Sequence, residues 1–198
     1  MKVADRITLF RITLAPIFFI LYMMPVYFPV QFKGTAIWLL PLTWVIAITA
    51  EITDYFDGFA ARNLKQSSDF GKLFDPFADT LLQLTAFLCF VIDGILPAVL
   101  FLVIIYREFG ILFIRNLMLR KGITMGARMS GKIKTVTYIC AAAFCLAYTS
   151  ICRLGILAFI QPYAKITALV VFCISVLFSV ISFFDYIRVY LAAQKAAD

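Results

Sequence analysis

The sequence predicts an all-α integral membrane protein with six transmembrane helices and with both termini in the cytoplasm. Of its 198 residues, 64% are hydrophobic and only 15% are charged, whereas soluble domains average about 25% charged residues. Apolar segments of membrane-spanning length follow one another along the chain, and Lys and Arg gather around alternate links between them. Together these observations predict one polytopic membrane domain over residues 1–198.

Six segments are long and apolar enough to be transmembrane helices. In chain order they are residues 8–30, 35–60, 72–92, 95–119, 131–152 and 165–191. Each reaches the roughly 20 residues that a helix needs to cross the hydrocarbon core. The links that end them contain polar residues, Pro or Gly, and cover residues 31–34, 63–70, 93–97, 120–130 and 153–165.

The basic residues predict the orientation in the membrane. Of the 18 Lys and Arg residues, 14 lie near the two termini or around the second and fourth links. Three lie in the other links, and Arg107 lies inside a span. Positive charge remains on the cytoplasmic side, so the termini and the 63–70 link are expected there, at the inner (cytoplasmic) membrane. The net charge of +7 favours contact with anionic lipid headgroups over binding to nucleic acid.

The stretch DYFDGFAARNLKQSSDFGKLFDPFAD, residues 54–79, holds five of the eleven acidic residues. Asp54 and Asp57 are three residues apart and Asp75 and Asp79 are four apart, so each pair shares a helix face. If the two helices are antiparallel neighbours, four carboxylates converge at their cytoplasmic ends. Like charges repel there and desolvation costs several kcal/mol each, so a cation is required. Two hard divalent ions, Mg²⁺ or Mn²⁺, fit the oxygen ligands.

Small and basic residues accompany the aspartates. Gly58, Ala61 and Gly71 would let helices or a flat ligand approach closely, and Arg62 can make a forked contact with a phosphate. Two other interpretations are open: solvated acidic helix ends, and a transport pathway for divalent cations. Against the second, the outer halves of the two segments carry almost no polar residues.

Eight positions in this stretch form a pattern across 26 residues. They are Asp54-x-x-Asp57-Gly58-x-x-Ala61-Arg62, then eight residues, then Gly71-x-x-x-Asp75-x-x-x-Asp79. This pattern resembles the signature of the CDP-alcohol phosphatidyltransferase family, with no fixed position missing. The resemblance implies a six-helix membrane enzyme, usually a homodimer, that transfers a phosphatidyl or related group from a CDP-linked donor to an alcohol and releases CMP. An intact signature also disfavours an inactive scaffold.

The resemblance also implies roles for individual residues. Asp54, Asp57, Asp75 and Asp79 would hold two divalent ions, and Asp79 would also be the base that deprotonates the acceptor. The site for the CDP part of the donor would include these residues: Thr8, Asp54, Asp57, Gly58, Ala61, Arg62, Gly71 and Asp75.

The acceptor must be inferred from charges outside the signature. Arg107 lies inside the fourth segment, and Arg115 follows eight residues later on the same helix face. With Lys132 and Lys134 of the GKIKT motif they would form a cationic wall for a phosphate on the acceptor. Topogenic anchoring is the alternative for the two lysines. Glu108 could pair with a neighbouring cation or orient Arg107.

Further motifs resemble the bacterial phosphatidylglycerophosphate synthases of this family. They are TLFR (Thr8 to Arg11), YREFGILFIRNLM, GKIKT and FFDY, and the one departure is Asp5, where Asn is usual. Asp185 and Tyr186 of FFDY are expected to be a satisfied interfacial pair, with a position facing the dimer or the active site as the alternative.

The hypothesis is therefore transfer of a phosphatidyl group from CDP-diacylglycerol to sn-glycerol 3-phosphate on the cytoplasmic side of the bilayer. The products would be phosphatidylglycerophosphate and CMP. Transfer to another acceptor, such as inositol phosphate or choline, is the alternative, and a divalent-cation transporter is a remote one.

Overall fold

The structure is a computed structural model of the whole chain. It describes the backbone of residues 3–29, 36–64, 69–120 and 129–195, and the side chains of residues 8–29, 38–53, 76–119 and 129–194.

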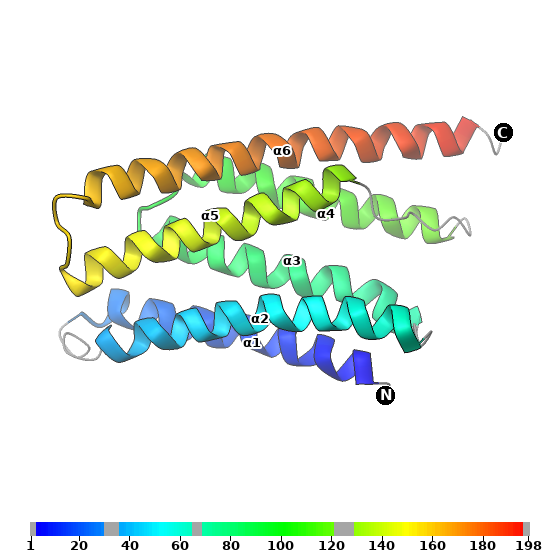
Figure 1. Ribbon diagram of the computed structural model, residues 1–198. Helices are drawn as coiled ribbons and strands as arrows, with labels where there is room; N and C mark the ends of the chain where they lie inside the picture. Colours follow the sequence, from blue (N-terminus) through cyan, green and yellow to red (C-terminus); the bar gives the residue numbers. More distant parts are fainter. Residues whose placement is uncertain (1–2, 30–35, 65–68, 121–128, 196–198) are drawn as a thin grey trace. The chain divides into compact units, whose positions relative to one another are not determined.

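Six α-helices make up the described chain, as predicted (Figure 1). They are α1 (Val3–Tyr27), α2 (Ala36–Leu64), α3 (Asp69–Ile92), α4 (Ala98–Arg120), α5 (Met129–Leu154) and α6 (Gln161–Lys195). The predicted ends differ from the observed ones by up to about five residues. Hydropathy marks the apolar part of a helix, whereas the backbone hydrogen bonds of α2, α3 and α6 continue into polar flanks.

Three of the described helices contain a stretch long and apolar enough to cross a membrane alone. These stretches are Thr8–Tyr27, Met129–Leu154 and Gln161–Gln194. Among the residues whose side chains are described, α2 and α3 contain the shorter apolar stretches Trp38–Thr53 and Pro76–Ile92. The fourth helix has Arg107, Glu108 and Arg115 within its length, which interrupts its apolar run.

The chain groups into two compact units. The first unit contains Met1–Asp93 and Thr149–Gln161, which are α1, α2, α3 and the end of α5. The second unit contains Gly94–Tyr148 and Pro162–Asp198, which are α4, most of α5 and nearly all of α6.

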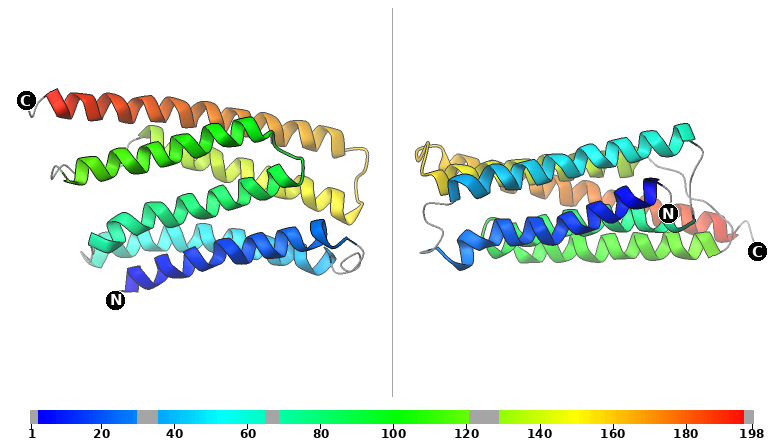
Figure 2. Two further views of the ribbon diagram at one scale, coloured as in Figure 1. Left: turned by 180° about the vertical axis from the view of Figure 1, so that it is seen from behind. Right: turned by 90° about the horizontal axis from the view of Figure 1, so that it is seen from below.

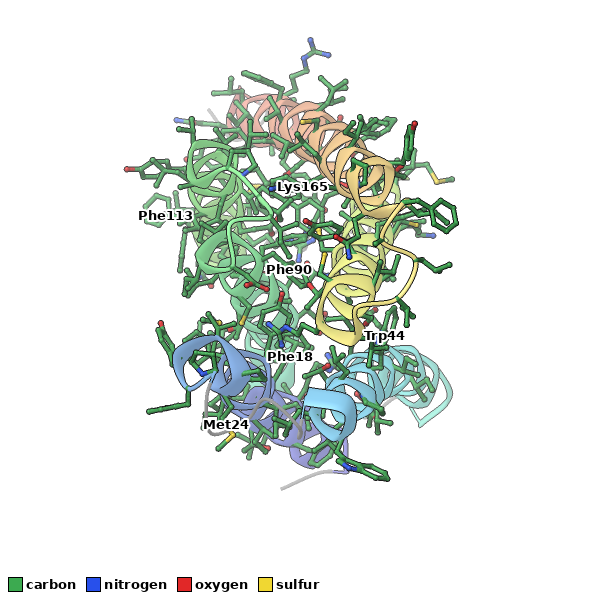
Figure 3. All side chains as sticks on the ribbon, turned by 90° about the vertical axis from the view of Figure 1, so that its left-hand side faces the viewer. Phe18, Met24, Trp44, Phe90, Phe113 and Lys165 are labelled. Atoms are coloured by element: carbon green, nitrogen blue, oxygen red, sulfur yellow. The ribbon has the colours of Figure 1, made fainter. Side chains whose placement is uncertain are left out.

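In the first unit, α1 packs against both α2 and α3. Its buried face repeats every three or four residues, as an α-helix requires, and consists of Thr8, Arg11, Leu14, Ala15, Phe18 and Tyr22. The start of α1, the end of α2 and the start of α3 lie at one end of this unit (Figures 1 and 2). Viewed along the helices, Phe18 points into the unit and Met24 away from it (Figure 3). The α1 helix therefore borders the end at which the signature lies.

A polar cluster closes the opposite end of the first unit. The Tyr22 hydroxyl donates a hydrogen bond of 2.8 Å to Asp93 and shares another of 2.8 Å with the Thr149 hydroxyl. Arg153 donates to Asp93 over 3.1 Å and to the Tyr22 carbonyl over 3.0 Å, with its guanidinium 4.3 Å from the centre of the Tyr22 ring. Trp44 of α2 donates to Ser150 over 3.0 Å. These bonds tie α1, α2, α3 and the end of α5 together.

In the second unit, α4 runs parallel to α6, and α5 runs antiparallel to both (Figure 1). A Cβ placed on Gly110 would lie 2.9 Å from the Phe183 ring, so the absence of a side chain permits the close approach of α4 and α6. Phe113, on the other side of α4, is 65% exposed and points outward (Figure 3). The inner face of α6 carries small polar residues and one tyrosine in the helical period: Ser175, Ser179, Ser182 and Tyr186.

Candidate active site

The signature residues lie on two helices of the first unit. Asp54, Asp57, Gly58, Ala61 and Arg62 occupy the last turns of α2, and Gly71 and Asp75 occupy the first turns of α3. The helical conformation expected at these positions is therefore confirmed. Their side chains lie outside the described residues, as does that of Asp5.

Asp79 is the one signature aspartate whose side chain is described. Its Oδ1 accepts an ion-paired hydrogen bond from Nη1 of Arg11. The Arg11 side chain is 1% exposed, whereas that of Asp79 is 36% exposed. The carboxylate is thus fixed on one side by a buried guanidinium while part of its surface is open.

Thr8 lies one turn before Arg11 on the same face of α1. It is 1% exposed, so the residue expected in the donor site points into the first unit. Because residues three apart share a helix face, Thr8 and Arg11 present a hydroxyl and a guanidinium side by side near the signature end.

A divalent ion needs several hard oxygen ligands, and aspartate carboxylates provide them. Within residues with described side chains, no three His, Cys, Asp or Glu side chains gather closely enough to hold a metal. The expected ligands Asp54, Asp57 and Asp75 lie outside that part of the chain. Asp79 has a carboxylate that is 36% exposed, and it fits the expected ligand type.

In the second unit, three charged side chains meet in the interior. Glu108 Oε1 accepts from Arg107 Nη1 at 2.8 Å and from Lys134 Nζ at 2.9 Å. The side chains of Arg107, Glu108 and Lys134 are 5%, 6% and 10% exposed. Both alternatives considered for Glu108 therefore hold, since it pairs with Lys134 of α5 and also orients Arg107.

The Arg107 guanidinium is further held by α6. Its Nε donates to the Ser179 carbonyl over 3.1 Å and its Nη2 donates to the Ser182 hydroxyl over 2.9 Å. Lys134 lies 4.4 Å from the centre of the Tyr138 ring, and the Tyr138 hydroxyl meets Ser179 at 2.6 Å. Two cations and one carboxylate give this cluster a formal charge of +1, with geometry fixed by three helices.

Arg115 also reaches α6, two turns after Arg107. Its Nη2 donates to the Tyr186 hydroxyl over 2.9 Å, and its guanidinium lies 5.3 Å from the centre of the Tyr186 ring. Its buried Nε has no hydrogen-bond partner among the described residues. Arg115 therefore keeps a donor that an anion could take.

The neighbouring residue Asp185 accepts a hydrogen bond of 2.7 Å from Ser130, at the start of α5. Asp185 and Tyr186 thus connect α6 to two different helices, α5 and α4. The expectation that they are satisfied is confirmed, and their partners lie within the second unit.

The two lysines of the GKIKT motif lie in different environments. Lys134 is buried against Glu108, whereas Lys132 is exposed. Lys132 and Lys134 are two positions apart, which corresponds to about 200° around the helix axis. Their side chains therefore cannot face the same partner. Of the four basic residues expected to bind the acceptor phosphate, Arg107 and Lys134 share one carboxylate, Arg115 contacts Tyr186, and Lys132 faces outward.

Several site residues were not identified from the sequence. The positive charge near the N-terminus and the TLFR motif both include Arg11, but neither predicts its pairing with Asp79. Arg11 follows Thr8 by one turn on an apolar helix, and Ser175, Ser179 and Ser182 recur at helical spacing in an apolar segment. A search for polar residues at periods of three and four would have found both sets.

Comparison with known proteins gives consistent matches. The family model for CDP-alcohol phosphatidyltransferase matches residues 1–177. A Treponema pallidum protein named CDP-diacylglycerol–glycerol-3-phosphate 3-phosphatidyltransferase is 35% identical, over 98% of this chain and 92% of its own length. A Bacillus subtilis protein of the same name is 34% identical, over 98% of this chain and 97% of its own length. A Mycobacterium tuberculosis protein named probable phosphatidylglycerophosphate synthase is 30% identical, over 94% of this chain and 80% of its own length.

Proposed function

Because this chain belongs to the CDP-alcohol phosphatidyltransferase family, we propose that it transfers a phosphatidyl group from CDP-diacylglycerol to sn-glycerol 3-phosphate. The products are phosphatidylglycerophosphate and CMP. The observation that carries this proposal is the similarity, over nearly the whole chain, to two enzymes named for this reaction. The chain is therefore an enzyme of phospholipid biosynthesis.

Asp54, Asp57, Asp75 and Asp79 are the residues that would hold the divalent ions, on which this family generally depends. When bound, Mg²⁺ or Mn²⁺ supplies positive charge that offsets the charge building on the pyrophosphate as CMP leaves. Thr8, Gly58, Ala61, Arg62 and Gly71 complete the proposed site for the cytidine diphosphate.

Asp79 is the proposed general base. It takes the proton from the acceptor hydroxyl, whose oxygen forms a bond to the phosphorus that carries diacylglycerol. The bond from that phosphorus to the CMP oxygen breaks, and CMP leaves with the electron pair. The partial exposure of Asp79 supports this role, because a base must reach the hydroxyl within hydrogen-bond distance.

The acceptor's phosphate requires a cationic site. Arg107, Arg115, Lys132 and Lys134 remain the proposed residues, and their environments support different contributions. Arg115 has a buried Nε–H that no described residue accepts, whereas Arg107 and Lys134 are tied to Glu108 and chiefly supply net positive charge. The exposed position of Lys132 favours a smaller contribution.

The proposed setting is the cytoplasmic membrane, with six spans, both termini in the cytoplasm and the reaction on the cytoplasmic side. The distribution of Lys and Arg supports this orientation. The acyl chains of the donor enter from the bilayer, because they cannot favourably cross water. A homodimer is part of the same proposal.

An acceptor panel tests the proposed function. Purified protein in detergent or vesicles, with CDP-diacylglycerol and Mg²⁺, is given radiolabelled glycerol 3-phosphate, inositol phosphate, serine or choline. Labelled lipid is expected with glycerol 3-phosphate, and Asp79→Asn is expected to reduce its formation by about 100- to 10,000-fold. Labelled lipid with another acceptor alone would contradict the assigned acceptor, and near wild-type turnover of Asp79→Asn would exclude Asp79 as the base.

A further inference from the structure

Arg11 occupies a position that an apolar residue would normally fill. It lies in the middle of the buried face of α1, with Thr8 on one side and Leu14, Ala15 and Phe18 on the other. Burying a guanidinium costs several kcal/mol unless it is paired and hydrogen-bonded. A positioned anionic partner is therefore needed, and α3 provides it through Oδ1 of Asp79.

The α1 and α3 helices are tied to each other at two levels. Arg11 meets Asp79 at one level, and Tyr22 meets Asp93 over 2.8 Å at the other. Tyr22 lies about three turns after Arg11, and Asp93 lies about four turns after Asp79. Two bonds so far apart fix the axial position of α1 against α3. The position of the Arg11 guanidinium is consequently fixed by the placement of α1 against α3 as well as by the ion pair.

We propose that Arg11 is a positioning residue for Asp79. Its guanidinium holds Oδ1, prevents rotation of the carboxylate and so fixes the direction of Oδ2 toward the acceptor hydroxyl. This inference rests on the proposed function, in which Asp79 is the general base.

The chemistry of the pair suits this role. A guanidinium is planar and stays charged under all physiological conditions, so it orients a carboxylate more rigidly than the single ammonium of Lys does. A base displaced by about 1 Å can lose about 100-fold in rate, and loss of a residue that orients a catalytic group typically costs about 10- to 100-fold. The effect should appear in kcat, because Arg11 acts through Asp79 and not on substrate affinity.

The test compares Arg11→Met and Arg11→Lys with the matched control Arg188→Met, which removes an exposed arginine of α6. Arg11→Met is expected to lower kcat by about 30- to 100-fold, and Arg11→Lys by about 10-fold, because it keeps the charge but loses the planar guanidinium. KM for both substrates should change by less than about 3-fold, and Arg188→Met should match the wild type. Monodispersity and thermal unfolding in detergent identify any variant that fails to fold. If Arg11→Met fails to fold, Arg11→Lys still tests the proposal.

A double variant separates positioning from a general structural role. If Arg11 acts through Asp79, Arg11→Met should cause no further loss in an Asp79→Asn background. The inference would be overturned if the kcat losses of the two single variants multiplied in the double variant. It would also be overturned if the Arg11 variants stayed within about 3-fold of the wild-type kcat while Asp79→Asn was inactive. Either result would leave the proposed function intact. A wild-type-like Asp79→Asn would instead show that the assigned base is wrong, and the role of Arg11 would fall with it.

Discussion

Glu108 of α4 and Lys134 of α5 form an ion pair of 2.9 Å in the interior of the second unit, and the same carboxylate oxygen also accepts from Arg107. One anion therefore pairs with two cations that would otherwise repel each other. Glu108 offsets part of the cost of burying Arg107 and Lys134, because its carboxylate pairs with both charged groups.

Glu108→Gln should strongly destabilise the protein. The substitution keeps the shape but removes the negative charge that Arg107 and Lys134 share, which is expected to cost about 3–5 kcal/mol of unfolding free energy. Thermal unfolding in detergent measures the effect. The double variant Glu108→Gln/Lys134→Met should recover much of the loss, since it removes one cation along with the anion. A melting temperature equal in Glu108→Gln and the wild type would contradict this account.

Arg115→Met should weaken recognition of the phosphorylated acceptor. A charge-assisted hydrogen bond contributes about 1.5–3 kcal/mol, so KM for glycerol 3-phosphate should rise about 10- to 100-fold while KM for CDP-diacylglycerol stays nearly constant. Lys132→Met should have a smaller effect, because Lys132 is exposed. Steady-state kinetics with each substrate varied in turn give both constants, with Arg188→Met as control. An equal rise in KM for both substrates would argue against a specific phosphate contact.

Gly110→Ala should disturb the packing of α4 on α6. The added methyl would lie 2.9 Å from the Phe183 ring, so the ring or the helix must move, at a cost of about 1–3 kcal/mol. Arg107 lies one turn away on the same helix, so its bonds to Ser179 and Ser182 should weaken as well. Thermal unfolding should show the loss, and Gly110→Ala/Phe183→Leu should restore part of it. No change in stability would indicate that Phe183 moves aside freely.

Tyr22→Phe should destabilise the first unit without altering its aromatic packing. The Tyr22 ring stacks on Phe18 with 5.9 Å between the ring centres, and it meets Phe90 edge-on with 5.4 Å between the ring centres. Phenylalanine at this position preserves both contacts. Loss of the hydroxyl removes the bonds to Asp93 and Thr149, which should cost about 1–3 kcal/mol. Tyr163→Phe, at a residue that is 70% exposed, is the matched control and should leave the melting temperature unchanged. Equal melting temperatures for the two variants would contradict the prediction.

Removal of divalent ions should abolish turnover reversibly. Four aspartates need positive charge beside a pyrophosphate, so EDTA should reduce activity to background, and excess Mg²⁺ or Mn²⁺ should restore it. Treatment with EDTA already saturated with Mg²⁺ is the control for effects of the chelator itself. Full activity after exhaustive chelation would exclude the proposed ions.

Much of the fold could be predicted because its signals are local in the chain. Apolar runs of bilayer length identify all six helices, and the spacing of Asp54, Asp57, Asp75 and Asp79 identifies the family. Helical periodicity also placed Arg107 and Arg115 on one face of α4, where both reach α6. The start of α1, the end of α2 and both ends of α6 were less accurate, because hydropathy does not record where backbone hydrogen bonding stops.

Partners across helices could not be predicted in the same way. The sequence by itself determined the helices, the acidic signature and the basic residues available to the site. Only the tertiary structure decided that Arg11 pairs with Asp79, that Glu108 serves two cations, and that Lys134 is buried while Lys132 is exposed. The physical reason is that periodicity fixes which residues share a face of one helix. The packing of the helices decides which neighbouring helix that face meets, and at what height.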